Sequence, residues 1–91
     1  MENKTPAQLG WEQQNAHFIK TFDFKDFRQA LAFINTVGDF SESQSHHPKI
    51  TNCYNQVVLE LWTHDEDSLT QKDRDWIVAF EEKYDGFKGY P

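Results

Sequence analysis

The chain is poor in several residue types, and each shortage excludes a class of protein. It contains one cysteine, Cys53, which excludes an intramolecular disulfide. Lysine and arginine never occur in runs and the formal net charge is -6, which disfavours direct binding to nucleic acid or to an anionic membrane. Apolar runs are a few residues long, far short of the ~20 residues that cross a bilayer. We therefore expect neither a direct nucleic acid partner nor a membrane.

The first ten residues also lack the features of a targeting segment. They contain neither an apolar signal core nor an arginine-rich amphipathic pattern, so we expect a soluble, cytoplasmic protein. They are polar, contain Pro6 and end at Gly10, which predicts a flexible or briefly helical lead-in over residues 1–10. Residues 11–91 are predicted to form a single domain, as expected for a chain of 91 residues.

Aromatic residues are abundant for so polar a chain. They make up 15% of the residues, although the mean hydropathy is -0.82. A domain of this size buries only roughly 60 to 65% of its unfolded-chain surface, so oligomerisation would help to stabilise it. We expect part of the aromatic surface to lie at a subunit interface.

The first half of the chain predicts two strands and a helix. Residues 11–16 are predicted to pair as a strand with a second strand whose phenylalanines, Phe18, Phe22 and Phe24, recur at even spacing. Apolar residues then recur at helical spacing from Phe27 onwards, with Asp23 as the expected N-cap and Gly38 as the expected C-terminal stop. Residues 39–48 are predicted to be a polar loop.

The second half repeats this order. Residues 49–54 and 57–64 are predicted strands joined by a tight turn at Asn55 and Gln56. Thr70 and Asp73 have the spacing of a capping box for a last helix that carries an apolar stripe as far as Tyr84, before the tail GFKGYP. The predicted fold class is α+β: a four-stranded antiparallel sheet with helices packed on one face, in the order strand-strand-helix-strand-strand-helix.

A cluster of titratable residues follows the first predicted helix. His46 and His47 are adjacent, Pro48 follows them, Glu42 lies four positions before His46, and His64 ends the fourth predicted strand. Histidine has an unperturbed pKa near neutrality, so three histidines gathered around one segment favour proton transfer. The alternative is a solvated surface loop, and His17 is interpreted as structural.

These residues resemble a known family, the pterin-4a-carbinolamine dehydratases, which in animals also act as dimerisation cofactors of a homeodomain transcription factor. The resemblance rests on Glu42 with His46-His47-Pro48, then Tyr54, Thr63-His64 and Asp73, and on the segment FDFKDFRQALAFINTVG. It spans Gly10 to about Tyr84. Two positions depart from the animal form: Ser45, where aspartate is common, and Lys72, where arginine is common.

The resemblance implies an activity and a set of roles. The family dehydrates 4a-hydroxytetrahydropterin to quinonoid dihydropterin, in recycling of the pterin cofactor of aromatic amino acid hydroxylases, without a metal or an organic cofactor. His46 and His64 would be acid and base in either order, His47 a substrate binder or second proton carrier, and Glu42 an orienting or substrate-holding group. The remaining predicted substrate-binding residues are Ser45, Pro48, Thr63, Asp65, Glu66, Lys72 and Asp73.

Several of these residues also have structural interpretations. Asp73 could simply close the capping box of its helix. A metal site is disfavoured, because adjacent histidines on an extended backbone point to opposite sides and no HxH or HExxH spacing is present. Cys53 is interpreted as a small buried residue, and Trp62 as part of the core or of an interface.

A second function class stays open beside the enzyme. The resemblance also implies interaction proteins, namely coactivators and assembly factors for a carbon-fixation enzyme, in which the predicted helix at residues 25–38 would present the partner surface. The retained histidine set favours the enzyme, and both functions can coexist on one chain. We expect a homodimer or a homotetramer.

Overall fold

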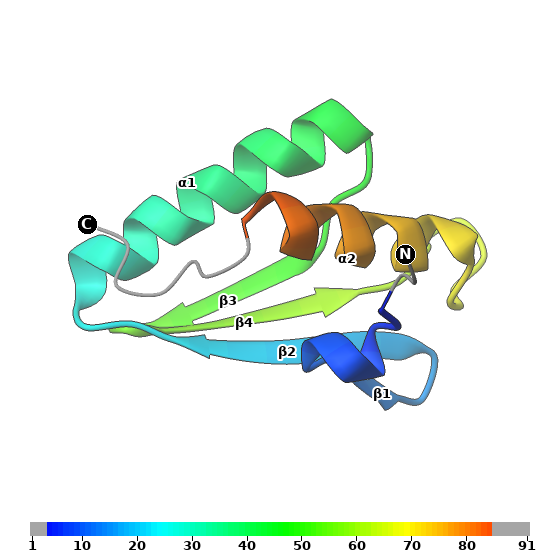
Figure 1. Cartoon of the computed structure of the whole chain (residues 1–91), viewed down its shortest axis with the longest axis horizontal. Coiled ribbons are helices and arrows are strands. Elements are labelled where there is room, and N and C mark those ends of the chain that lie inside the picture. Colours follow the sequence, from blue (N-terminus) through cyan, green and yellow to red (C-terminus); the bar gives the residue numbers. More distant parts are fainter. Residues whose placement is uncertain (1–3, 85–91) are drawn as a thin grey trace.

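The computed structural model describes residues 4–84, and in it two helices lie on one face of an antiparallel sheet (Figure 1). A short 3-10 helix η1 (Ala7–Leu9) precedes the first strands, β1 (Glu12–Gln14) and β2 (His17–Asp23). The helix α1 (Phe27–Gln44) leads to the hairpin of β3 (Lys49–Cys53) and β4 (Gln56–Leu61), and α2 (Gln71–Lys83) follows. The predicted α+β class and strand-helix order are confirmed. The predicted tail GFKGYP lies outside the described residues.

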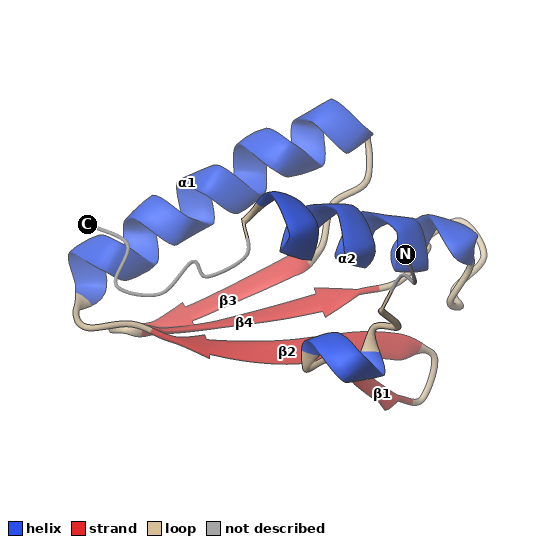
Figure 2. Cartoon of the chain, viewed as in Figure 1, coloured by secondary structure: helices blue, strands red, loops and turns tan. Residues whose placement is uncertain are grey.

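The sheet has the order β1-β2-β4-β3, and every neighbouring pair is antiparallel (Figure 2). In the central pair Phe18 lies opposite Leu61 and Phe22 opposite Val57, so the apolar alternation of both strands faces the helices. The other face of the sheet is not covered by a helix in the part of the chain that the structure describes.

The core lies between the helices and the inner face of the sheet. Phe33 of α1 is fully buried, and its ring lies 4.6 Å from that of Phe22 and 4.9 Å from that of Phe24. Phe40 of α1 packs against Trp76 and Phe80 of α2, with ring centroids 5.1 and 5.4 Å apart. These aromatic contacts hold α1 against α2 as well as against the sheet.

The first helix differs from its prediction at both ends. Its N-cap is Asp26, whose side chain accepts a hydrogen bond from the backbone N–H of Gln29, and Asp23 is instead the last residue of β2. The helix also continues past Gly38 to Gln44, because Phe40 and Ser41 extend its buried face. The predicted loop at residues 39–48 is therefore mostly helix, and only residues 45–48 connect it to β3.

The second hairpin also differs in detail. Cys53 pairs with Gln56 in the ladder, so the turn is Tyr54-Asn55, with Tyr54 at a φ of 52°. The prediction of a turn at Asn55 and Gln56 was wrong by one residue. Cys53 is exposed, because it lies on the edge strand β3 and at the face that no helix covers, so the prediction of a buried cysteine was also wrong. The strand β4 ends at Leu61, earlier than the predicted residue 64.

The second helix is bound to β2 and to the residue before β1 through Glu81. Its carboxylate accepts hydrogen bonds from Lys20 Nζ at 2.8 Å and from Trp11 Nε1 at 2.9 Å. Lys20 also donates to the carbonyl oxygen of Leu9. This network joins β2, α2 and the segment after η1, and it fixes the position of the helix whose first turn carries Asp73.

None of the helices in the described ranges is long and apolar enough to cross a membrane.

Candidate active site

The end of α1 determines where the histidine pair lies. Ser45 adopts a left-handed conformation with a φ of 54° and donates its backbone N–H to the carbonyl of Glu42. The backbone N–H of His46 donates to the carbonyl of Ser41, and the carbonyl of His46 accepts from Trp76 Nε1 at 2.9 Å. These hydrogen bonds fix the direction of the backbone where it leaves the helix, and therefore the starting positions of the His46 and His47 side chains.

His46 is bound to a buried carboxylate. Its Nε2 lies 2.6 Å from Oδ1 of Asp73, a residue with no exposed surface. An ionised carboxylate only accepts hydrogen bonds, so Nε2 carries the proton and Nδ1 is the nitrogen left for other chemistry. Among the described residues, Nδ1 of His46 has no hydrogen-bond partner.

The second carboxylate oxygen of Asp73 accepts two further hydrogen bonds. Oδ2 accepts from the Thr63 hydroxyl at 2.8 Å and from the backbone N–H of Thr70 at 2.9 Å, which closes the predicted capping box of α2. The capping-box interpretation of Asp73 is confirmed, and the same side chain also contacts His46. The other hydrogen bonds of Asp73 are with neutral groups, so among the described residues His46 is the titratable side chain that contacts this carboxylate.

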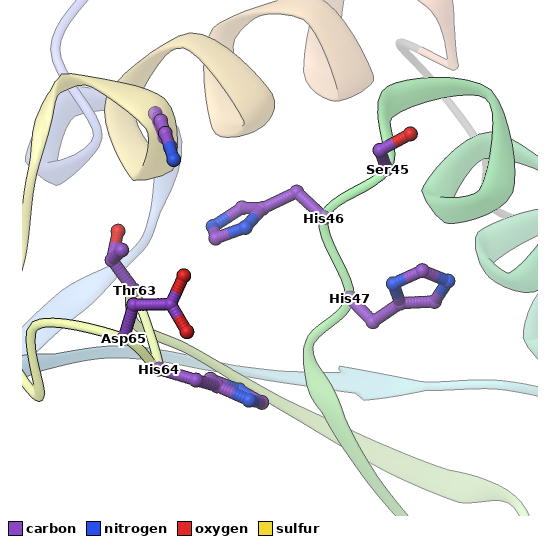
Figure 3. Close-up of a pocket in the computed structure, with 7 residues that line it drawn as sticks. Ser45, His46, His47, Thr63, His64 and Asp65 are labelled. Carbon is purple, nitrogen blue, oxygen red and sulfur yellow. The ribbon is translucent and has the colours of Figure 1, made fainter.

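His47 points away from His46 and is paired at the surface. Figure 3 shows the two imidazoles on opposite sides of the backbone. His47 Nε2 lies 2.6 Å from Oε2 of Glu42, and these side chains are 53% and 80% exposed. A contact this exposed adds at most about 1 kcal/mol of stability even between charged groups, so its effect is mainly on the orientation of the ring.

His64 reaches the same pocket from the other side. It follows β4 in a turn that a bridge between Thr63 and Ser68 closes, and Figure 3 shows it below His46 and beside Asp65. It is exposed, and among the described residues neither of its ring nitrogens has a hydrogen-bond partner. Both nitrogens are therefore accessible to a ligand.

These side chains surround an open pocket of about 210 Å³. This is below the ~300 Å³ at which ligand pockets usually begin, so a ligand larger than the pocket would stay partly exposed to solvent. Its lining includes charged residues of both signs, Asp65 and Lys72. Its lining residues are Ser45, His46, His47, Thr63, His64, Asp65 and Lys72.

The structure brings together most of the predicted site residues, but not all of them. Glu42 and Asp73 lie behind the pocket as hydrogen-bond partners of His47 and His46. Pro48 and Glu66 are not among its lining residues, and Glu66 is exposed in the turn after His64. No group of three or more His, Cys, Asp or Glu residues that could hold a metal ion is present in the part of the chain that the structure describes.

Two tryptophans at the site were not identified as such from the sequence. Trp76 was placed in the apolar stripe of its helix, but its indole N–H also holds the backbone of His46. Trp62 was interpreted as part of the core or of an interface, yet its ring stacks on that of His64. The sequence contained a signal for each, since Trp76 follows Asp73 by three positions on a helix and Trp62 precedes His64 by two on an extended segment.

Comparisons with known proteins point to one family. The family described as Pterin 4 alpha carbinolamine dehydratase matches residues 1–82. A putative pterin-4-alpha-carbinolamine dehydratase of Thermomicrobium roseum is 45% identical over 64 residues, covering 70% of this chain and 69% of that protein. One of Trichormus variabilis is 46% identical over 75 residues, covering 82% and 81%.

Two solved structures share the fold. A transcriptional coactivator/pterin dehydratase from Brucella melitensis has a TM-score of 0.73 and 31% identity, over 80% of each chain. A pterin dehydratase-like protein identified as a RuBisCO assembly factor in the alpha-carboxysome has a TM-score of 0.64 and 24% identity, over 90% of this chain and 93% of that one. The second likeness concerns the fold alone.

Proposed function

Because this chain belongs to the pterin-4-alpha-carbinolamine dehydratase family, a family of hydro-lyases, we propose that its histidine pocket dehydrates 4a-hydroxytetrahydropterin to quinonoid dihydropterin. The product would then return to the cycle of an aromatic amino acid hydroxylase, as the family resemblance implies. The observation that carries the proposal is the pairing of His46 with buried Asp73 in a pocket that His47 and His64 also line.

The reaction needs one acid and one base. The bond between the ring carbon and its hydroxyl group breaks, and the departing oxygen takes a proton from the acid and leaves as water. The neighbouring ring nitrogen loses its proton to the base, and its electrons form the new carbon-nitrogen double bond. Proton transfer by a positioned side chain contributes typically about 10²- to 10⁴-fold to a rate.

His46 has the surroundings of the acid. Its Nε2 is hydrogen-bonded to the buried Asp73 carboxylate, and among the described residues its Nδ1 has no hydrogen-bond partner. In its protonated form, His46 would donate the Nδ1 proton to the leaving hydroxyl group. Thr63, through its hydrogen bond to Asp73, fixes the carboxylate in this arrangement.

His64 has the surroundings of the base. Neither of its nitrogens is engaged by a described residue, so in either tautomer the unprotonated nitrogen can accept the proton of the substrate nitrogen. His47, oriented by Glu42, would bind the substrate or relay a proton to solvent. Ser45, Asp65 and Lys72 would contact the polar edges of the pterin, and Pro48 would restrict the backbone after the pair.

The first test is the rate at which quinonoid dihydropterin appears from freshly generated 4a-hydroxytetrahydropterin, followed by absorbance. We expect the wild type to exceed the spontaneous rate, and His46→Ala and His64→Ala each to lower kcat about 100-fold or more. Cys53→Ser is the control, because Cys53 is exposed at the hairpin end of β3 and does not line the pocket. A folded wild type that does not exceed the spontaneous rate would contradict the proposal.

A second function rests on a different surface. Phe27 and Leu31 are 43% and 42% exposed and lie one turn apart on α1. We propose that this pair contributes to a contact with a second copy, in a homodimer or homotetramer, or with a protein partner. The coactivator description of the solved relative from Brucella melitensis favours such a role beside catalysis.

A further inference from the structure

The ring of Trp62 stacks on the rings of two histidines, on the face of the sheet away from the helices. The ring centroid of His17 is 4.1 Å from that of Trp62, with the planes 12° apart. The ring centroid of His64 is 4.6 Å from that of Trp62, with the planes 29° apart. The indole therefore contacts one histidine that lines the pocket and one that does not.

The pairing of β2 with β4 produces this arrangement. Phe18 lies opposite Leu61, so His17 and Trp62 are the next opposed positions of the two chains. Along the β4 segment Leu61 and Thr63 are buried, whereas Trp62 and His64 alternate with them and face outward. The stack thus follows from strand register and needs no special loop geometry.

His17, the histidine of the stack that does not line the pocket, is itself held by a hydrogen bond. His17 Nδ1 is hydrogen-bonded to Oε2 of Glu60, and the two side chains are each 26% exposed. Glu60 lies in the central strand and pairs with Ile19 in the ladder. A series of contacts therefore runs from Glu60 in β4 through the His17 ring to the Trp62 ring. The Trp62 ring in turn contacts the ring of His64.

His64 has no other restraint of this kind. It is exposed, and no described residue hydrogen-bonds to its ring, in contrast to His46 with Asp73 and His47 with Glu42. A flat stack restricts rotation of the imidazole about its side-chain bonds while its two nitrogens stay at the ring edge. An imidazolium is also attracted to the face of an indole, so the contact persists when the ring gains a proton.

We propose that Trp62 is a positioning residue for the His64 imidazole. The hydrogen bond between His17 and Glu60 holds the His17 ring against Trp62 and so keeps the indole in place. The inference rests on the proposed function, in which His64 is the base. If Trp62 served only in packing, its replacement would change stability and leave turnover unchanged. Turnover and the geometry of the His64 ring therefore distinguish a positioning role from a purely structural one.

The kinetic test compares Trp62→Leu with Trp62→Phe. Leucine removes the aromatic face and should lower kcat about tenfold with a smaller change in KM, less than the ~100-fold that a misplacement of 1 Å can cost. Phenylalanine keeps an aromatic face and should restore most of kcat. Val58→Ala is the matched control, since Val58 is half-buried on the same face of β4 and is not part of the stack.

The second arm measures ring geometry without turnover. The chain has four histidines, so their carbon-bound ring protons can be followed individually by NMR in D₂O and assigned with His64→Gln. The ring current of Trp62 should shift the His64 protons upfield in the wild type. The shift should be lost in Trp62→Leu and largely kept in Trp62→Phe.

The two arms separate failure of the inference from failure of the proposed function. Wild-type turnover that Trp62→Leu leaves unchanged, or His64 resonances that Trp62→Leu does not move, would overturn the positioning role. A wild type without turnover would overturn the proposed function, while the NMR arm would still report whether the stack holds His64.

Discussion

At the scale of single residues, Asp73 links the stability of the chain to its chemistry. One oxygen of its buried carboxylate binds His46, and the other accepts from Thr63 and from the first turn of α2. Hydrogen bonds to a charged group contribute about 1.5 to 3 kcal/mol each, so this side chain is held firmly. The same contacts that fix the start of α2 therefore fix which nitrogen of His46 faces the pocket.

Replacing Asp73 with asparagine should separate these roles. The amide oxygen can still accept from Thr63 and from the backbone of Thr70, so we expect a folded protein. The amide nitrogen would face Nε2 of His46 as a donor, which forces the other tautomer and removes the negative charge. We expect Asp73→Asn to lower kcat about 100-fold or more, measured by the same absorbance assay with circular dichroism to monitor folding.

Asp75→Asn is the matched control for this substitution. It removes the same charge from the same helix, but Asp75 is exposed and bonds only the side chain of Gln71 among the described residues. It should keep activity within about twofold, because an exposed charge is screened by solvent. An Asp73→Asn variant as active as Asp75→Asn would remove His46 and Asp73 from the mechanism.

At the scale of elements, the length of α1 decides where the histidine pair lies. The sequence predicted an end at Gly38, a residue that often follows a helix. Phe40 continues the buried stripe and contacts Trp76 and Phe80, so tertiary packing extends the helix to Gln44. Glu42 therefore lies on the last turn of the helix and not in a loop, which places it beside His47.

Because Gly38 is inside the helix, replacing it with alanine should stabilise the protein. A Cβ atom at this position would meet nothing within 4 Å. Alanine lowers the backbone entropy of the unfolded chain, so we expect Gly38→Ala to raise the free energy of unfolding by about 0.5 to 1 kcal/mol. Urea and thermal denaturation followed by circular dichroism would measure this gain.

Gly10→Ala is the opposing control. Gly10 ends η1 with a φ of 91°, and a Cβ atom there would lie 3.2 Å from Cε of Lys20. Alanine at a left-handed position is strained by about 1 kcal/mol or more, so this variant should be destabilised. If Gly38→Ala also lost stability, the interior placement of Gly38 in α1 would be wrong.

At the scale of the whole molecule, placing both helices on one side divides the surface into two different faces (Figure 1). The face of the sheet without helices carries the stack of His17, Trp62 and His64. The outer side of α1 carries exposed Phe27 and Leu31. A contact made through α1 would therefore leave that stack uncovered.

We expect the apolar pair on α1 to affect the state of association. If it lies at a contact between copies, the wild type should have a mass at least twice the 10.8 kDa of one chain in size-exclusion chromatography with light scattering. Phe27→Ser combined with Leu31→Ser should shift the mass towards one chain, because burial of each large apolar side chain contributes about 1.5 to 3 kcal/mol.

Arg28→Ser is the control for this pair. It shortens an exposed side chain on the same helix without removing an apolar one, and it should leave the mass unchanged. A wild type of 10.8 kDa at micromolar concentration would contradict a contact between copies.

The sequence by itself determined the features that depend on neighbours along the chain. Alternation of apolar residues predicted the strands, and the spacing of Thr70 and Asp73 predicted the capping box of α2. The histidine cluster is likewise a local pattern, and its resemblance to a family supplied the proposed reaction. The capping box and the strand alternation needed only spacing, because they involve residues within three positions of one another.

The tertiary structure decided the contacts between distant residues. His46 and Asp73 are 27 positions apart, and His17 and Glu60 are 43 apart, so their meeting depends on how α2 lies on the sheet and on strand register. The end of α1 and the exposure of Cys53 were predicted wrongly for the same reason: packing against α2 extended the helix, and an edge strand left the thiol uncovered. Local spacing identified the titratable groups, whereas long-range packing determined which of them are paired and which nitrogens remain free.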